Sequence, residues 1–504
     1  MNRLSRLIAR LALACAAAAA LPCAAATFYI SPEGNDHHDG STRDKPLRSF
    51  ARAFTAMRGG DTLVLLNGEY SQATGTGGIT YQGRGSAQPP SGLGPDKPTR
   101  IEAAEPGKAI LREPLLIGRS FRKDSHIVLR GLTVLAQSAL YNTSHVTVKE
   151  CGFGGGFGIG TNDHHQGNTD NLVEDVWIWA EGQRIIAINY RSHRNVWRRV
   201  VVRGDGCGTA KCQGSGNPNV GFTVYDSHDV SVQNVIVVDR VLMPTDSPYS
   251  DFAIASHTGG QYTFGRNEWL GTLSLNAPDI AYYMEPDHNT IEVPTIRISN
   301  AIAWNATMGG FNLARAGKGN VVENITSHVK GGDAVRVAPE LGPEGVLRNV
   351  LVLGSGRYGI NSAYAPRQVA VRGQWLMGTY NQTRPQGELN VDPVASGALR
   401  HPLRIEARSP LKGKGVEGAD IGANMLLRYG TDGTRFGEPG YNAPTRQPLW
   451  PWPNEERIKA EMCKTTERGF CSPGRRLDGK GPVTLTSYIW ESMGRPMPAR
   501  LDAE

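Results

Sequence analysis

Residues 170–197 read DNLVEDVWIWAEGQRIIAINYRSHRNVW. Two β-rich runs that each follow an Asn begin at Leu172 and Val196, 24 residues apart, and a third run lies between them at 185–190. The spacing returns further along the chain, where Val321 and Val346 lie 25 residues apart. A repeat with a period of about 20–50 residues indicates a solenoid or an array of repeated units.

Similar runs of alternating Val and Ile, each after a polar turn with Asn or His, recur along most of the chain. They lie at 125–129, 144–148, 170–173, 194–197, 228–232, 319–322 and 345–350. A second set of strand-like runs lies at 185–190, 220–225, 252–255, 280–284, 311–314, 334–337 and 359–360. This pattern predicts a parallel β-helix with coils stacked at about 4.8 Å. Asn tolerates left-handed corners, and 61 glycines suit tight turns. The alternative, a β-propeller, would need longer repeats of about 40–45 residues.

Both ends of the repeat region carry further motifs. Before it stand FYISPEGND (28–36), DGS (39–41), KPLRSF (45–50), GDT (60–62) and NGEY (67–70); NVDP (390–393), LRI (403–405), SPL (409–411) and DIGA (420–423) follow it. These residues resemble the cap and the closing coil of pectate-lyase-like and chondroitinase-B-like β-helix proteins. The resemblance implies an all-β fold, a single-stranded right-handed parallel β-helix solenoid, with a capping helix within residues 47–57. Lyases, epimerases, hydrolases and adhesins share this frame, so it does not identify an activity.

The first 26 residues are typical of a signal peptide. Arg3, Arg6 and Arg10 precede an apolar stretch at 11–21, and three alanines at 24–26 form a cleavage site. We therefore expect an exported protein, periplasmic or extracellular, with no membrane span. The predicted units are the signal peptide (1–26), the β-helix with its cap (27–430) and an irregular C-terminal tail (431–504).

The cysteines fit this compartment. Cys207 with Cys212 and Cys463 with Cys471 are close pairs, which in an exported protein predict two local disulfides. Cys151 is expected to be a buried residue of a coil. Zinc is the weaker interpretation, because neither pair has CxxC spacing.

The tail is rich in Pro, Arg and Gly, and we expect it to pack on the solenoid. A short helix is predicted from Asn454 to Met462, with Asn454 as its N-cap. The sequence LWPWP at 449–453 leaves open an aromatic platform that binds sugar.

The formal net charge of the chain is +7. In an exported protein this favours an acidic polysaccharide as the partner rather than nucleic acid, and we expect a monomer.

Residues that point outward from one strand of each coil form a column in a solenoid. We align Ile186, Ile188 and Tyr190 with Val220, Phe222 and Val224 as inward residues. The predicted outward column then contains Asn189, Arg191, Thr223, Tyr225, Ser256, His257, Tyr283, Glu285, Asn312, Arg336 and Asn361, with Arg315 at a strand end.

This column can supply the chemistry of β-elimination on a uronate polymer. The reaction needs a cation at the carboxylate, a base for the C5 proton and an acid for the leaving oxygen. We expect His257 to be the base, Tyr283 or Tyr225 the acid, and Arg191 and Arg315 carboxylate clamps. The predicted substrate-binding residues are Asn189, Glu285, Asn312, Arg336 (also a clamp) and Asn361. The alternative for each residue is an ordinary polar position on a solvated face.

Other activities remain open. A polysaccharide C5-epimerase shares the proton abstraction, and a non-catalytic glycan-binding or surface β-helix protein needs no chemistry. The polar run at 284–289 loosely resembles an element of alginate epimerases, in a different order. Hydrolysis by paired carboxylates is disfavoured, because Asn168-Thr169-Asp170 is an isolated match to the hydrolase pattern.

No metal site is assigned from the sequence. Calcium is the cofactor that such lyases commonly use, and Glu285, Asp287 and Asp251 offer oxygen ligands. They do not form a contiguous Asp-rich loop. The loop NDHH at 162–165 is expected to be structural, since two neighbouring histidines on a strand would face opposite ways.

Overall fold

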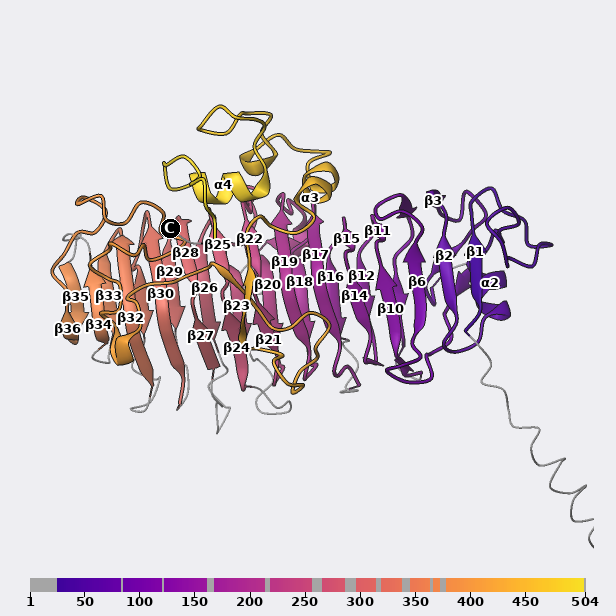
Figure 1. The fold of residues 1–504 in the computed structure, drawn as a ribbon, viewed down its shortest axis with the longest axis horizontal. Coiled ribbons are helices and arrows are strands. Elements are labelled where there is room, and N and C mark those ends of the chain that lie inside the picture. The colour runs from indigo at the N-terminus through magenta and orange to yellow at the C-terminus, as the bar shows by residue number, and fades with distance from the viewer. Residues whose placement is uncertain are drawn as a thin grey trace, which may run out of the picture.

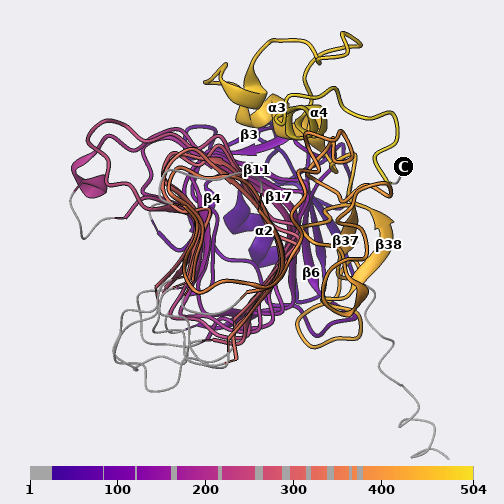
Figure 2. The ribbon, with the colours of Figure 1, turned by 90° about the vertical axis from the view of Figure 1, so that its left-hand side faces the viewer.

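The computed structural model describes residues 25–82, 85–119, 122–160, 167–213, 218–255, 265–285, 296–313, 319–337, 345–362, 366–371 and 378–502. Its strands stack side by side into a long solenoid (Figure 1). Seen along the axis, the coils superpose around one bore (Figure 2). The chain is thus a right-handed parallel β-helix, as predicted.

Two long parallel sheets form the wall. One has 11 strands: β8 (Leu116–Ile117), β12 (Ser138–Leu140), β16 (Phe157–Gly160), β18 (Ile185–Tyr190), β20 (Val220–Tyr225), β23 (Ser250–Ala255), β26 (Ile280–Glu285), β29 (Gly309–Leu313), β31 (Val335–Val337), β33 (Tyr358–Ser362) and β35 (Gly378–Gln382). The other has 21 strands: β1 (Thr27–Ile30), β2 (Thr62–Leu65), β3 (Gly68–Tyr70), β6 (Thr99–Ala103), β7 (Ala109–Leu111), β10 (Ile127–Arg130), β11 (Thr133–Val134), β14 (Thr147–Lys149), β15 (Gly152–Phe153), β17 (Leu172–Ala180), β19 (Val196–Gly204), β21 (Ser231–Gln233), β22 (Ile236–Val238), β24 (Asn267–Leu270), β25 (Leu273–Leu275), β27 (Ile296–Ser299), β28 (Ile302–Ala306), β30 (Val321–Val329), β32 (Val346–Gly354), β34 (Arg367–Val371) and β36 (Gln386–Glu388).

The repeat seen in the sequence is the pairing register of the coils. Leu172 pairs with Val196, and Val321 pairs with Val346. The second set of predicted runs forms the 11-stranded sheet. Each repeat is therefore one coil, and residues one period apart lie beside each other in neighbouring strands.

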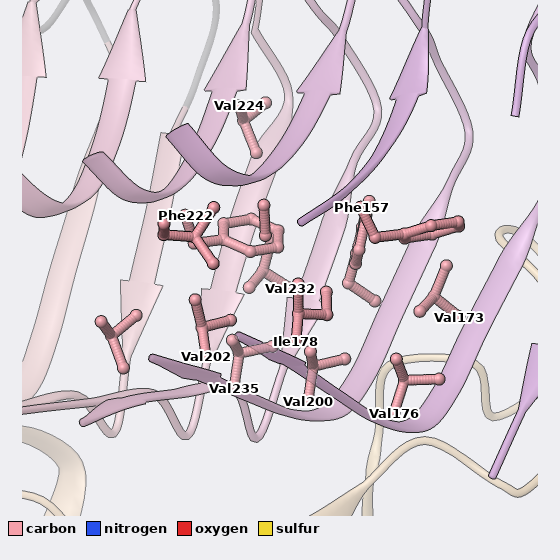
Figure 3. Close-up of a cluster of buried hydrophobic side chains, with 14 of the residues drawn as sticks. Phe157, Val173, Val176, Ile178, Val200, Val202, Phe222, Val224, Val232 and Val235 are labelled. Atoms are coloured by element: carbon pink, nitrogen blue, oxygen red, sulfur yellow. The ribbon is translucent and has the colours of Figure 1, made fainter. Parts of the chain in front are cut away.

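Apolar side chains from both sheets fill the bore. Figure 3 shows part of this core, in which Phe157 and Phe222 meet valines such as Val200 and Val232. Further along, the ring of Tyr282 stacks between Phe252 and Phe311, with centroid distances of 4.8 and 4.5 Å. Such stacked rings bury much apolar area in each coil, which stabilises the repeat.

The predicted capping helix is present as α2 (Phe50–Ala56). Ser49 begins it by accepting a hydrogen bond from the backbone of Arg52, which satisfies one free N–H of the first turn. Phe50 and Phe54 are buried, and Phe50 packs on Tyr70 at 5.6 Å. The helix lies across the end of the bore in the axial view (Figure 2), so it covers apolar residues that an open end would expose.

The C-terminal part of the chain returns along the outside of the solenoid. We call residues 416–442 the strap. It runs along a corner of the 21-stranded sheet where successive coils turn through a left-handed residue, with φ between 48° and 62°. The strap contacts are Val416 N–H to Asn349 Oδ1 (2.8 Å), Asn324 Nδ2 to the Asp420 carbonyl (2.8 Å), Asn424 N–H to Asn300 Oδ1 (3.2 Å), Tyr429 N–H to Asn234 Oδ1 (2.7 Å) and Arg199 Nη2 to Asp432 Oδ1 (2.9 Å).

Within the strap, β37 (Leu427–Tyr429) pairs antiparallel with β38 (Pro444–Pro448), which follows the strap. Two helices come after this pair, α3 (Glu455–Met462) and α4 (Leu485–Glu491). The helix predicted at 454–462 is confirmed, but the Asn454 side chain does not cap it. Trp450 and Trp452 are 2% and 3% exposed and belong to an apolar cluster between tail and solenoid. The interpretation of this segment as a sugar-binding platform is therefore wrong, because neither ring faces solvent.

The cysteine predictions are confirmed. Cys207 pairs with Cys212 and Cys463 with Cys471, with Cα–Cα distances of 6.0 and 5.2 Å, and Cys151 is buried and unpaired. Residues 1–24 of the predicted signal peptide lie outside the described residues. Within those residues, none of the helices is long and apolar enough to cross a bilayer.

Candidate functional site

The 11-stranded sheet sets which residues face outward. Ala187 pairs with Phe222, and Asn189 pairs with Val224, so Ala187 and Asn189 point into the bore. Asn189 is fully buried; its Oδ1 accepts from Asn195 Nδ2 (3.0 Å) and Trp197 Nε1 (3.2 Å). The predicted alignment of this strand was wrong by one residue, and Asn189 cannot contact a substrate. Ile188 and Tyr190, predicted inward, face out.

In each strand of this sheet, the residue between the two inward-facing residues points outward, and these outward residues form a row from strand to strand. Pairing from strand to strand gives Gly158, Ile188, Thr223, Ala253, Tyr283, Asn312, Arg336, Asn361 and Asn381, which we call the outward row. The structure thus places Tyr283, Asn312, Arg336 and Asn361 on four successive strands, about 4.8 Å apart. Thr223 and Ala253 are buried, so the accessible parts of the row lie around Ile188 and from Tyr283 to Asn381. The second of these parts can contact several units of a linear polymer.

The later part of the row is polar. Asn361 donates to Asp333 Oδ2 (2.9 Å) and accepts from Asn381 Nδ2 (3.0 Å), which fixes the orientation of its amide. Asn312 Oδ1 is buried and has no hydrogen-bond partner among the described residues. Arg336 is exposed, and within the described ranges no carboxylate forms an ion pair with it. Its exposed guanidinium is accessible to an external anion.

Aromatic residues flank the row at two places. Tyr249 packs edge-on against Tyr283, with ring centroids 4.9 Å apart. Tyr190 packs against Tyr225 at 5.2 Å, two residues beyond the row members Ile188 and Thr223 on strands β18 and β20. Half-buried tyrosine rings offer an apolar face and a hydroxyl, a combination that suits the mixed surface of a sugar.

Arg191 and Tyr225 belong to a local charged cluster. The Arg191 guanidinium lies 4.6 Å from the centre of the Tyr190 ring, and its Nε is 3.5 Å from Asp226 Oδ2. Burial raises the pKa of Tyr225, and Asp226 and Tyr190 raise it further. Tyr225 therefore keeps its proton at neutral pH and can act as an acid. The positive charge of Arg191 is already balanced by Asp226, which makes it a poorer carboxylate clamp than predicted.

A hollow of about 390 Å³ lies over the first strands of this sheet. Its lining residues are Gln82, Pro114, Leu116, Gln137, Ser138, Ala139, Tyr141, Phe157, Gly158, Gly160, Ile185, Ile186, Ile188 and Tyr190. Strand β16 forms its floor, because Gly158 and Gly160 stand beside Ile188 and Tyr190 in the pairing register. A Cβ on Gly158 would approach the Ile188 side chain to 2.7 Å, so a larger residue would fill this space.

Several predicted residues cannot be placed. His257, Arg315 and the ligand candidate Asp287 lie outside the described residues. Glu285 ends β26 in register with Ala255.

The described residues offer little for a metal. Asp251 is buried in an ion pair with Arg240 (2.9 Å), so it is not free to bind calcium. In the part of the chain that the structure describes, one group brings together three potential ligand atoms: Cys207, Cys212 and Asp246. The two sulfurs of that group form a disulfide, and we assign no metal site.

Some residues of this face were not predicted from the sequence. Tyr249 precedes its strand and was not aligned with any column, and Tyr190 was assigned to the bore. One feature of the sequence indicates the hollow: in FGIG at 157–160, the glycines at 158 and 160 alternate with two large apolar residues. Two glycines two residues apart in a strand leave one face without side chains.

No protein-family model and no curated protein sequence matches the chain. Among solved structures, the chain is similar to the pectate lyase Pel9A at 16% identity and a TM-score of 0.45, over 79% of this chain and 95% of that one. It is similar to XylC in complex with xylose at 8% identity and a TM-score of 0.46, over 73% and 86%. For a rhamnogalacturonan lyase the identity is 12% and the TM-score 0.34, over 72% and 87%. Identities and scores this low say nothing about substrate or reaction.

Proposed function

We propose that the protein is an exported polysaccharide lyase that cleaves a uronic-acid-containing polymer by β-elimination. The observation that carries the proposal is the outward row, in which a tyrosine, an amide and an arginine without an ion-pair partner among the described residues stand on successive strands at Tyr283, Asn312 and Arg336. A row along the solenoid axis suits a linear chain, and its cation suits a carboxylate.

The residues have distinct roles in this proposal. Arg336 binds the uronate carboxylate and stabilises the charge that develops there when the C5 proton leaves. A base removes that proton, the C4–C5 double bond forms, and the C4–O glycosidic bond breaks. Tyr283 protonates the departing oxygen. His257 remains the base predicted from the sequence.

Asn312 supports the same arrangement. Its buried oxygen lacks a partner among the described residues, and such a group is costly unless a ligand donates to it. A sugar hydroxyl is a suitable donor. Tyr225, whose raised pKa keeps it protonated, would serve a sugar further along the polymer.

The test is incubation of the full mature protein with a panel of acidic polysaccharides. Each β-elimination creates an unsaturated uronate that absorbs in the ultraviolet and one new reducing end. We expect both signals on at least one polymer, and their loss in Tyr283→Phe. Uronate NMR signals that change without chain cleavage would instead identify an epimerase, and binding without either change would identify a binder.

A further inference from the structure

The hollow and the polar part of the outward row differ in charge. Of the described residues that line the hollow, none carries a charged side chain. Leu116, Ile186 and Phe157 are buried beneath it, while Tyr141 and Tyr190 are half-buried at its sides. Arg336 lies on the same face, five strands beyond Ile188.

From this contrast we infer the substrate class. The polymer is an acidic heteropolysaccharide in which neutral sugars separate the uronates, and the hollow binds a neutral stretch. The inference rests on the proposed function in one respect, that a polysaccharide occupies the outward row.

The size of the hollow supports this assignment. It spans β8, β12, β16 and β18, which at about 4.8 Å per strand is about 15 Å along the axis. That length holds more than one pyranose ring. A homopolymer of uronates would place a carboxylate at every ring, and each would lose water against isoleucine, leucine and tyrosine without gaining a cation among the described lining residues. Arg191, which stacks on Tyr190 at the edge of the hollow, is already paired with Asp226.

A neutral sugar fits the same lining. Its C–H faces can lie on the rings of Tyr141 and Tyr190. Its hydroxyls can bond to the amides of Gln82 and Gln137, which are exposed at the rim and both donate and accept. The missing side chains of Gly158 and Gly160 let such a ring approach the sheet backbone.

The experiment measures binding of three polymers of decreasing charge density: polygalacturonate, with a uronate at every residue; hyaluronan, at every second; and gellan, at every fourth. Dissociation constants of the full mature protein are measured by calorimetry at constant ionic strength. We expect gellan to bind at least about ten-fold more tightly than polygalacturonate, with hyaluronan between them.

Two variants sharpen the result. Ile188→Arg adds a cation inside the hollow and should weaken gellan and strengthen polygalacturonate, each by about ten-fold. Gln386→Arg adds the same charge to an exposed strand of the other sheet and should leave the ratio unchanged. Equal binding of the three polymers, no binding of any, or a ratio that Ile188→Arg does not alter would overturn the inference.

The outcomes separate this inference from the proposed lyase activity. If the protein binds sparsely charged polymers more tightly, depends on Ile188 for this preference and cleaves none of them, the inference about the hollow is supported and the proposed lyase activity is refuted. If the protein cleaves a polymer but shows no preference for sparse charge, the lyase activity is supported and the inferred substrate class is refuted.

Discussion

The imidazole rings of His126 and His145 stack on two successive coils, with their centroids 4.8 Å apart, next to the strap. Arg435 of the strap donates from Nη2 to Thr147 Oγ1 (2.8 Å) and to the His145 carbonyl (3.5 Å). Protonation of the histidines would therefore place three cations together at one corner of the solenoid.

The first prediction is that acid loosens the strap. Burial lowers the pKa of His126, and His145 and Arg435 lower it further. Burial also lowers the pKa of His145; Asp170 and Glu438 oppose this shift, while Arg435 and Lys123 add to it. The docked state thus favours neutral rings, and its stability falls as the pH drops below the ordinary histidine pKa of about 6.5.

Hydrogen exchange of the peptide covering 431–442, corrected for intrinsic rates, measures this effect. We expect about ten-fold faster exchange at pH 5 than at pH 7.5, and little difference in His126→Gln/His145→Gln. Helix α3 serves as the internal reference. Equal acceleration in the double variant would show that other groups cause it.

The second prediction concerns Glu174, which is fully buried under the strap. It accepts from Lys149 Nζ (2.7 Å), Arg198 Nη1 (2.8 Å) and the Gly433 N–H (3.0 Å). Glu174→Gln removes the one carboxylate that these cations share, which should cost about 3 kcal/mol of unfolding free energy at neutral pH. Urea unfolding measures it.

The cost should depend on pH in a defined direction. Burial alone would raise the pKa of Glu174, but Arg199 and Lys149 lower it to about 2. The stabilisation is thus complete above the ordinary pKa of 4.5 and is lost as the pH falls towards 2. Glu102→Gln, in an exposed pair with Arg100, is the control and should change stability by less than about 0.5 kcal/mol.

The third prediction tests the outward row. Arg336→Ala should weaken binding of the acidic polymer by about 10–100-fold, since a hydrogen bond to a charged group contributes about 1.5–3 kcal/mol. Thermal stability should not change, because the side chain is exposed. Arg446→Ala, which removes an exposed arginine on β38 of the tail, should bind normally; equal losses in both variants would indicate only a general charge effect.

The fourth prediction concerns the disulfide Cys463–Cys471, which closes a short loop beside α3. Replacing both cysteines by serine should destabilise the tail by about 2.5 kcal/mol through the entropy of the open loop. Limited proteolysis should then cut between 463 and 502 first. Unchanged resistance would mean that the apolar cluster around Trp490 holds the tail without the covalent link.

The sequence predicted the solenoid because its period is also its pairing register, as with Leu172 and Val196. It predicted the cap and both disulfides for similarly local reasons. It failed on β18, where Asn189 is a polar residue in the bore. Its amide is bonded by Asn195 and Trp197 of the following turn and strand, and alternation of apolar residues cannot reveal such a partner.

The strap contacts also could not be predicted from any short stretch of the sequence. Asn300 and Asn424 lie 124 positions apart, and each looks like an ordinary turn residue. For the row, the sequence identified Tyr283, Asn312 and Arg336 as outward, but their neighbours depend on register. Tyr249 reaches Tyr283 from outside its strand, so no column alignment includes it.

The length of the strap constrains the number of coils in the solenoid. Its contacts occur in fixed order, from Val416 at Asn349 to Asp432 at Arg199, so its own length must match the number of coils between them. A coil inserted or deleted within that span would put every later contact out of step by about 4.8 Å. A coil added between the cap and His126 lies outside the span of the strap contacts and would leave the strap in step.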